Sequence, residues 1–321
     1  MSFTAGQMLD IIEAAGYPTM WVSIPLEYDV TTWTAMLDSG ERVNFFETMV
    51  SAPQIAVKAL MVANAPATPS FTIAQRFDCR LVAGIAPFDV LYLQRCNGTQ
   101  LFINGANYPI IAGGVSKSVT GLSVATLYYV YAYWTGTIIA LEFSTTPFAG
   151  DAEHDHLIKT GDGSRTYVGM VYMPAAGLAF KDNDQERFVA SYFNRINKPC
   201  QRGLTTNRTA TAGPWVELNS AERIEFICHG EESSTVWNVA TASHSAAAQN
   251  VYAGLGVNGA ATQLVRAVMQ SSAIGGFFNI SKVSAYKFTL GYNFLTTLGG
   301  VDSGTGTYYS SNESFGAMLR Q

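Results

Sequence analysis

The chain carries little charge. Only 13% of its 321 residues are Asp, Glu, Lys or Arg, about half the share found in an average globular protein. A protein that stays monomeric in solution usually carries more charge, so we expect much of this surface to be covered by partner chains. The formal net charge of −5 argues against a nucleic-acid partner, because such a partner needs a basic surface.

Long hydrophobic runs are also missing. The apolar stretches are interrupted well before the roughly 20 residues that a membrane-spanning helix needs, so we expect no membrane insertion. The N-terminal residues Met1 to Gly6 do not show the basic segment and apolar core of a secretory signal peptide. Export by a cellular secretion route is therefore not expected.

The four cysteines lack the spacing of a metal or redox motif. There is no CxxC pair and no His at zinc-finger spacing. We interpret them as free thiols, mostly buried, in a protein made in a reducing cytoplasm. They are Cys79, Cys96, Cys200 and Cys228.

What the chain does have is a composition typical of many short strands joined by tight turns. Gly occurs 29 times, and Thr, Ser and Ala separate the apolar runs. The length favours two or three domains. We predict an all-β protein with two sandwich-like or jelly-roll-like domains, residues 77–199 and 200–321, behind a small mixed N-terminal segment, residues 1–76.

The N-terminal segment differs from the rest in composition. Thr4 can cap a short helix over residues 5–15, which Gly16 and Pro18 would end. The prolines and small residues of 65–70 read as a linker. We interpret residues 1–76 as a segment that docks onto another protein.

From about Phe77 the apolar pattern has a period of two. Asn97-Gly98 stands between apolar runs, which predicts a tight hairpin. The run 127–134 is apolar or aromatic on both faces, so we expect a central strand covered on both sides. The predicted strands of this domain are 88–95, 99–103, 127–134, 137–143, 166–173 and 187–193.

The C-terminal region shows a similar pattern. Eight short strands in about 120 residues are typical of a sandwich or jelly roll. Asn258-Gly259 marks a further hairpin turn. The predicted strands are 215–218, 222–229, 236–240, 250–257, 261–269, 275–280, 286–298 and 314–319.

Two stretches resemble known proteins. Residues 122–128, Leu-Ser-Val-Ala-Thr-Leu-Tyr, resemble the L-x-x-x-T-x-Y corner of fibronectin-III-like sandwiches, in which the Tyr hydroxyl bonds back to the backbone. Residues 122–173 and the stretch from Trp215 to Arg320 resemble bacteriophage tail-fibre and virion-surface spike proteins. The resemblance covers about residues 77 to 321 and implies a virion protein, usually a trimer, with β domains at its tip.

Candidate catalytic residues do not form a convincing set. His154-Asp155-His156 could place two imidazoles together for a transition metal, but flanking Gly and Pro residues favour an exposed loop, and third and fourth ligands are not apparent. The acid pairs Glu231-Glu232 and Asp182/Asp184 could suggest glycoside hydrolysis, yet solubility explains them equally well. We expect no enzyme activity, no catalytic residues, no cofactor and no metal, although the sequence leaves metal binding by this loop open.

Aromatic residues beside polar ones remain as candidates for binding. Sugar rings stack on aromatic faces and hydrogen-bond to amides and carboxylates. The stretch 308–312 follows a flexible Gly-Thr-Gly turn and reads as exposed, although its tyrosines could instead pack in a strand or at a subunit contact. The predicted receptor-binding residues are Asn258, Tyr308, Tyr309 and Asn312.

These observations predict a structural virion protein of a bacteriophage. It would be a tail-fibre, spike or knob subunit on the particle exterior, and its β domains would attach to host surface glycans. Residues 1–76 would join it to other virion proteins. Low charge and two-sided apolar strands favour a homo-oligomer, and the fibre resemblance favours a trimer. The alternative is a capsid decoration or head-fibre protein with a mainly structural role. A glycan-processing enzyme would need a convergent acid pair or a metal in a cleft, and an exported adhesin would need a signal peptide; the sequence shows none of these.

Overall fold

The computed structural model describes residues 22–23, 32–37, 42–46 and 74–321, the last range without residues 176, 178, 212, 214, 260 and 261. The helix expected over 5–15 and the linker expected at 65–70 lie outside these residues. The chain divides into two compact units, Met1–Thr72 and Ile73–Gln321. In the first unit three strands pair antiparallel: β1 (Val22–Ser23), β2 (Thr32–Leu37) and β3 (Arg42–Phe46).

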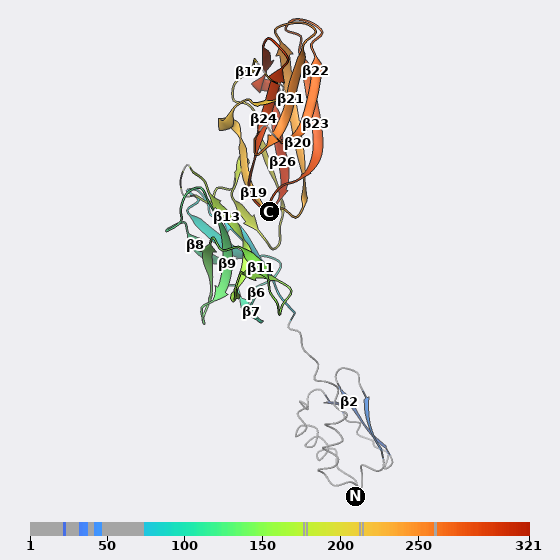
Figure 1. Cartoon of the computed structure of the whole chain (residues 1–321). Helices are drawn as coiled ribbons and strands as arrows, with labels where there is room; N and C mark the ends of the chain where they lie inside the picture. The colour runs from blue at the N-terminus through green and yellow to red at the C-terminus, as the bar shows by residue number, and fades with distance from the viewer. Residues whose placement is uncertain are drawn as a thin grey trace. The chain divides into compact units, whose positions relative to one another are not determined.

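The regular elements of the described residues are almost all strands (Figure 1). Among them, the helical elements are two short 3₁₀ turns, Ser220–Glu222 and Ser310–Asn312. The all-β fold class predicted from the period-two pattern is therefore confirmed.

The first sandwich packs one large sheet against smaller ones. The large sheet has the order β10-β9-β13-β12-β11, with β15 also paired to β13. It faces the three-stranded sheet β4-β5-β8 and the hairpin β6-β7 across one core, to which β5, β9 and β13 contribute Leu91, Val130 and Val168. The strands are β4 (Cys79–Ala83), β5 (Val90–Arg95), β6 (Gln100–Ile103), β7 (Ala106–Pro109), β8 (Val115–Ser118), β9 (Thr126–Trp134), β10 (Ile139–Ser144), β11 (Phe148–Gly150), β12 (Leu157–Lys159), β13 (Asp162–Met173) and β15 (Val189–Ser191).

Strand β9 is central, as its two apolar faces predicted. It lies between β10 and β13, and Val130, Tyr131 and Ala132 in its middle are buried. The corner that precedes it also forms, because the hydroxyl of Tyr128 accepts a hydrogen bond from the backbone N–H of Ser123 at 2.9 Å. That bond fixes the crossing into the strand, as the resemblance to the L-x-x-x-T-x-Y corner implied.

The hairpin predicted at Asn97-Gly98 is wrong. Strand β5 pairs with β4 and β8, whereas β6 pairs with β7 through the turn at Asn104-Gly105. Asn97 does adopt a positive φ of 61°, but the chain there crosses between sheets instead of folding back. The carboxylate of Asp78 accepts the N–H groups of Thr99 and Gln100 at 3.0 and 3.1 Å, which stabilises this crossing.

The second sandwich consists of two six-stranded sheets. Their orders are β14-β19-β24-β21-β22, with β18 paired to β24, and β16-β26-β20-β25-β17, with β23 paired to β20. Leu255 and Leu295 from one sheet meet Val236 and Phe315 from the other in the core. The strands are β14 (Glu186–Arg187), β16 (Asn197–Arg202), β17 (Arg208–Ala210), β18 (Val216–Glu217), β19 (Ile224–Cys228), β20 (Ser233–His244), β21 (Asn250–Val257), β22 (Gln263–Gln270), β23 (Phe278–Lys287), β24 (Gly291–Val301), β25 (Gly306–Tyr308) and β26 (Ser314–Arg320).

The boundary between β23 and β24 differs from the prediction. A single strand was expected over 286–298, but β23 ends at Lys287 and β24 begins at Gly291. The turn between them carries Phe288, which is buried in the core, so hydropathy gives no break there. Gly291, with a φ of 95°, provides the actual break.

The two sandwiches share a junction within one compact unit. Strand β14 pairs parallel to β19, and Met170, Ala190 and Ile227 form a small apolar cluster between the sandwiches. The guanidinium of Arg187 in β14 donates to Asp182, Asp184 and the carbonyl of Pro199. The acids Asp182 and Asp184, interpreted from the sequence as solubilising surface groups, are thus ion-paired at this junction.

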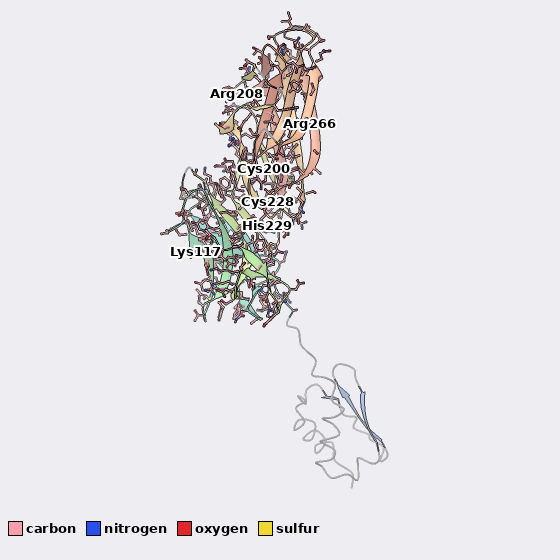
Figure 2. All side chains as sticks on the ribbon, in the orientation of Figure 1. Lys117, Cys200, Arg208, Cys228, His229 and Arg266 are labelled. Atoms are coloured by element: carbon pink, nitrogen blue, oxygen red, sulfur yellow. The ribbon has the colours of Figure 1, made fainter. Side chains whose placement is uncertain are left out.

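The thiols are largely hidden from solvent. All four cysteines are free; Cys79, Cys200 and Cys228 are buried and Cys96 is half-buried. Cys200 and Cys228, labelled in Figure 2, both belong to the core of the second sandwich. Burial raises the pKa of the Cys228 thiol to about 11, so it stays protonated and unreactive at neutral pH.

Gly169 lies where β13 packs closely against Leu81 and the backbone of Ala190. Its φ is 150°, the register with β9 shifts there, and an added Cβ would lie 2.6 Å from Leu81 Cδ1 and against the carbonyl oxygen of Ala190. We therefore expect Gly169→Ala to lower the free energy of unfolding by about 2–4 kcal/mol. Gly163→Ala in the same strand is the matched control, because a Cβ there meets nothing within 4 Å. Urea denaturation measures both, and equal stabilities of the two variants would contradict this account of the bulge.

Glu313 predicts a pH-dependent stability. Its Oε2 is buried and has no hydrogen-bond partner within the described ranges, and burial, together with the charge of Glu222, raises the pKa of Glu313 to about 8. The unfolded chain releases this proton near pH 4.5, so stability falls as pH rises from 4.5 to 8, by at most about 1.4 kcal/mol for each pH unit.

Glu313→Gln keeps a neutral group of the same shape and should remove this pH dependence. We expect the variant to match the wild type in thermal unfolding at pH 5 and to melt at a higher temperature than the wild type at pH 8.5. Parallel curves for the two proteins across this range would show that Glu313 is already ionised in the folded protein.

Candidate functional site

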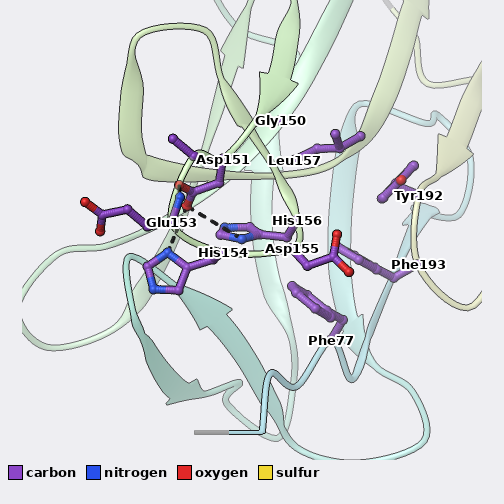
Figure 3. Close-up of a pocket in the computed structure, with 11 residues that line it drawn as sticks. Phe77, Gly150, Asp151, Glu153, His154, Asp155, His156, Leu157, Tyr192 and Phe193 are labelled. Carbon is purple, nitrogen blue, oxygen red and sulfur yellow. Dashed lines mark hydrogen bonds and ion pairs between the residues drawn. The ribbon is translucent and has the colours of Figure 1, made fainter. Parts of the chain in front are cut away.

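The loop of the first sandwich that joins β11 to β12 contains two histidines and three acidic residues. It is a closed hairpin loop, since the N–H of Asp151 donates to the carbonyl of His156 at 2.9 Å. Within it the N–H of His156 donates to the carbonyl of His154 at 2.8 Å, which makes a second tight turn. These two bonds fold residues 151–156 so that Asp151, His154 and His156 converge on one side (Figure 3).

The carboxylate of Asp151 organises the loop. Its Oδ1 accepts the N–H of Glu153 at 2.9 Å, which is an Asx-type turn. Its Oδ2 lies 3.1 Å from Nδ1 of His154 and 3.7 Å from Nδ1 of His156. One carboxylate oxygen thus faces both imidazoles, and each of the three residues offers a ligand atom within 4.8 Å of the other two.

His156 corrects the expectation of an exposed loop. The residue is only 8% exposed, because its ring packs edge-on against Phe102 at 5.3 Å and lies against Phe77. Among the residues that the structure describes, neither ring nitrogen has a hydrogen-bond partner. His154 is half-buried and its ring also meets Phe102, whereas Asp155 is exposed.

The charges of the loop are set by opposing effects. Burial disfavours ionisation of Asp151, but the N–H of Glu153, the bond with His154 and the charges of both histidines outweigh it, so the pKa of Asp151 is lowered. Burial lowers the pKa of His156, against the attraction of Asp151. The ionised carboxylate of Asp151 therefore lies beside the neutral, buried imidazole of His156.

A cavity of about 530 Å³ opens beside this loop. The loop residues 150–157 line one part of it, and Phe77, Tyr192 and Phe193 line another. The rings of Phe77 and Phe193 stack with centroids 4.3 Å apart, so the aromatic part is preformed. Figure 3 shows Phe77, His156 and Phe193 around this space.

Tyr308, predicted to be exposed for receptor binding, is instead fully buried. Its hydroxyl accepts the N–H of Gly300 at 2.6 Å and lies 2.5 Å from the carbonyl of Tyr252, to which it donates. The ring fills the space left by glycine, since a Cβ on Gly299 would overlap it. A ring enclosed in this way offers no face to a sugar, so Tyr308 is a core residue.

The neighbouring Tyr309 is half-buried and belongs to an aromatic pair. Its ring centroid lies 5.0 Å from that of Phe277, and its hydroxyl is 2.8 Å from the hydroxyl of Ser243. Phe277 is 69% exposed. The sequence does not single out Phe277, because it stands in the turn between β22 and β23, 32 positions before Tyr309, and pairing across that distance leaves no local pattern.

The two amides predicted for receptor binding lie apart. Asn312 is exposed in the 3₁₀ turn that follows Tyr309. Asn258 is exposed at the β21–β22 turn, where its Oδ1 accepts the N–H of Phe294 at 2.8 Å. Because Asn258 sits beside one end of β24 and Tyr308 bonds to Gly300 near the other, roughly 20 Å of strand separates them. The four predicted residues therefore do not form one site.

Comparison with known proteins assigns no family. No protein-family model and no curated protein matches the chain. Among solved structures, a chain of infectious bursal disease virus, Gx strain, is 11% identical with a TM-score of 0.29, covering 62% of this chain and 53% of that one. The VP2 subviral particle of the same virus is 11% identical with a TM-score of 0.26, covering 84% and 78%. PorU from Porphyromonas gingivalis is 9% identical with a TM-score of 0.26, covering 63% and 20%.

The similar structures thus include viral proteins, but at TM-scores below 0.3 they carry no argument about function. The match spans about half the length of the Gx-strain chain. Within the described part of the chain, no helix has the length and apolar character needed to span a membrane.

Proposed function

We propose that this chain is a non-enzymatic structural protein of a bacteriophage particle, a tail-fibre, spike or knob subunit that presents its second sandwich to host surface glycans. The proposal draws on the resemblance of residues 77–321 to phage fibre and spike proteins, on the low charge, and on the all-β fold. Residues 1–76 would join the subunit to other virion proteins.

The observation that carries the attachment role is the aromatic pair of Phe277 and Tyr309. Isolated exposed apolar residues are common on any protein, but here a largely exposed ring stands against a second ring whose hydroxyl is fixed by Ser243. Polar residues stand close to the pair in sequence: Asn279, two positions after Phe277, accepts a hydrogen bond from Thr241, and Ser310, next to Tyr309, donates its N–H to Asn207. Flat apolar faces beside amides and hydroxyls suit a sugar ring.

The exposed side of the second sandwich supports self-association. Strands β22 and β23 are the edge strands of its two sheets, and Val268 and Val283 on them are 51% and 65% exposed. Unpaired edge strands with apolar side chains invite pairing with another chain unless they are covered. Cyclic symmetry would cover them without open-ended growth, which agrees with the trimer implied by the fibre resemblance.

Alanine substitutions test the attachment surface. Purified Phe277→Ala and Tyr309→Ala should each bind about tenfold more weakly to an array of bacterial surface polysaccharides. Each variant lacks one ring, whose contact with a sugar contributes about 1–1.5 kcal/mol of binding free energy. Ile85→Ala, 94% exposed on the first sandwich, is the control and should bind as the wild type does. Absence of wild-type binding, or wild-type binding by both aromatic variants, would exclude this attachment surface.

Light scattering tests the assembly. The wild type should have a mass near three times 34.6 kDa. Val283→Lys places a charge in the proposed contact and should shift the mass toward one chain, while Ile85→Lys should leave it unchanged. A wild-type protein that stays a monomer at micromolar concentration would show that the edge strands are not completed by further copies.

A further inference from the structure

We propose that Asp151, His154 and His156 form a binding site for a divalent first-row transition metal, with Zn²⁺ as its best-fitting ion. This site is independent of the attachment role, because it lies in the first sandwich on the β11–β12 loop. The sequence left it open for want of a third ligand, and the fold brings Asp151 to that position.

The donor set matches this class of ion. Imidazole nitrogen and carboxylate oxygen are the ligands that Zn²⁺ takes in three-ligand sites with one open position. Two imidazoles and one carboxylate disfavour Ca²⁺ and Mg²⁺, which prefer oxygen ligands alone. The same set also binds Cu²⁺, Ni²⁺ and Co²⁺, with affinities that follow the usual order for these ions.

The His156 ring is buried without a hydrogen bond to either of its nitrogens in the described part of the chain. A buried polar group without a hydrogen bond costs about 1–3 kcal/mol, so native structures hold few of them. His156 is more than nine-tenths buried, and neither of its ring nitrogens has a hydrogen-bond partner in the described part of the chain. Its Nδ1 faces the carboxylate of Asp151 at 3.7 Å, too long for a hydrogen bond but compatible with an ion between them.

The other two buried histidines provide an internal comparison. His229 donates from Nε2 to the carbonyl of Ser191 at 3.0 Å, and its Nδ1 is 3.4 Å from the hydroxyl of Tyr167. His244 accepts the N–H of Ala246 at Nδ1 and lies 2.6 Å from the carbonyl of Ser303 at Nε2. This protein therefore satisfies both nitrogens of a buried imidazole elsewhere, and His156 is the exception.

The distances are close to those of a bound ion. Ligand atoms about 2.0–2.1 Å from a tetrahedral Zn²⁺ lie roughly 3.3 Å apart. The Asp151–His154 separation is already 3.1 Å, the Asp151–His156 separation is 3.7 Å, and no pair of the three ligand atoms exceeds 4.8 Å. Small side-chain rotations within the loop would complete the contraction.

The surroundings hold the ligands in place and leave one coordination position open. Phe102 packs edge-on against both imidazoles, and the N–H of Glu153 orients the carboxylate of Asp151 from behind. Outer contacts of this kind orient metal ligands. The cavity lined by Phe77, Tyr192 and Phe193 adjoins the loop, so a fourth ligand, either water or a donor from a bound molecule, would enter from there.

Zinc titration of the tag-free, full-length protein tests the site. Calorimetry with ZnCl₂ should show one ion per chain, and Zn²⁺ should raise the thermal unfolding temperature, because a ligand that binds only the folded state stabilises it. Asp151→Asn keeps an Oδ1 acceptor for the Glu153 N–H, and His154→Ala removes a half-buried ring, so both should fold. Each should weaken Zn²⁺ binding at least about 100-fold.

Asp155→Asn and Glu153→Gln are the matched controls, since both acids line the same cavity but lie outside the cluster. They should bind Zn²⁺ as the wild type does. No binding by the wild type below millimolar Zn²⁺ would overturn the proposal. So would binding that survives both Asp151→Asn and His154→Ala, which would place the ion elsewhere, for example at Cys96.

Discussion

Strand β13 is buried on both faces, and the rest of the Ile73–Gln321 unit is arranged around that constraint. Val168 and Val171 point into the core of the first sandwich, whereas Met170 belongs to the cluster that meets the second. A strand can serve two cores only if both faces are apolar and its neighbours satisfy its backbone. Strand β13 pairs with β9, β12 and β15, and the Gly169 bulge shifts its register so that both faces are filled.

The junction follows from this strand. Tyr172 of β13 packs against Tyr292 of β24 with ring centroids 4.5 Å apart, and Tyr167 contacts His229 just after β19. Burial lowers the pKa of His229 to about 4, so the ring is neutral at pH 7 and donates to the carbonyl of Ser191. Because these contacts are buried and directional, the two sandwiches belong to one compact unit although each has its own core.

Local sequence patterns predicted most of the fold but little of the candidate site. The all-β class, the central position of β9 and the Tyr128 corner were predictable, because period-two alternation and a corner motif are short-range signals. The Asn97-Gly98 hairpin was wrong because positive φ allows a turn without deciding which strands then pair. Tyr308 was misplaced because a Tyr after a Gly-rich turn reads the same whether it points outward or into the space over Gly299. The place of Asp151 as a third ligand and the pairing of Phe277 with Tyr309 were not predicted, because both depend on contacts made only in three dimensions.

Two buried polar groups without hydrogen bonds show two ways in which a fold can accommodate the same cost. Glu313 lies near Glu222, whose carboxylate is held by Arg208 and Thr205. Burial and the charge of Glu222 both oppose ionisation of Glu313, so Glu313 keeps its proton, as its raised pKa indicates. His156 differs, because a neutral imidazole is already uncharged and a proton would only add a buried charge. Its Nδ1 lies 3.7 Å from the carboxylate of Asp151, and its ring lies 5.9 Å from the ring of His154. A cation bound by all three residues would give His156 a partner and balance the charge of Asp151. It would also bind the ring of His154, which a proton on His156 would not do.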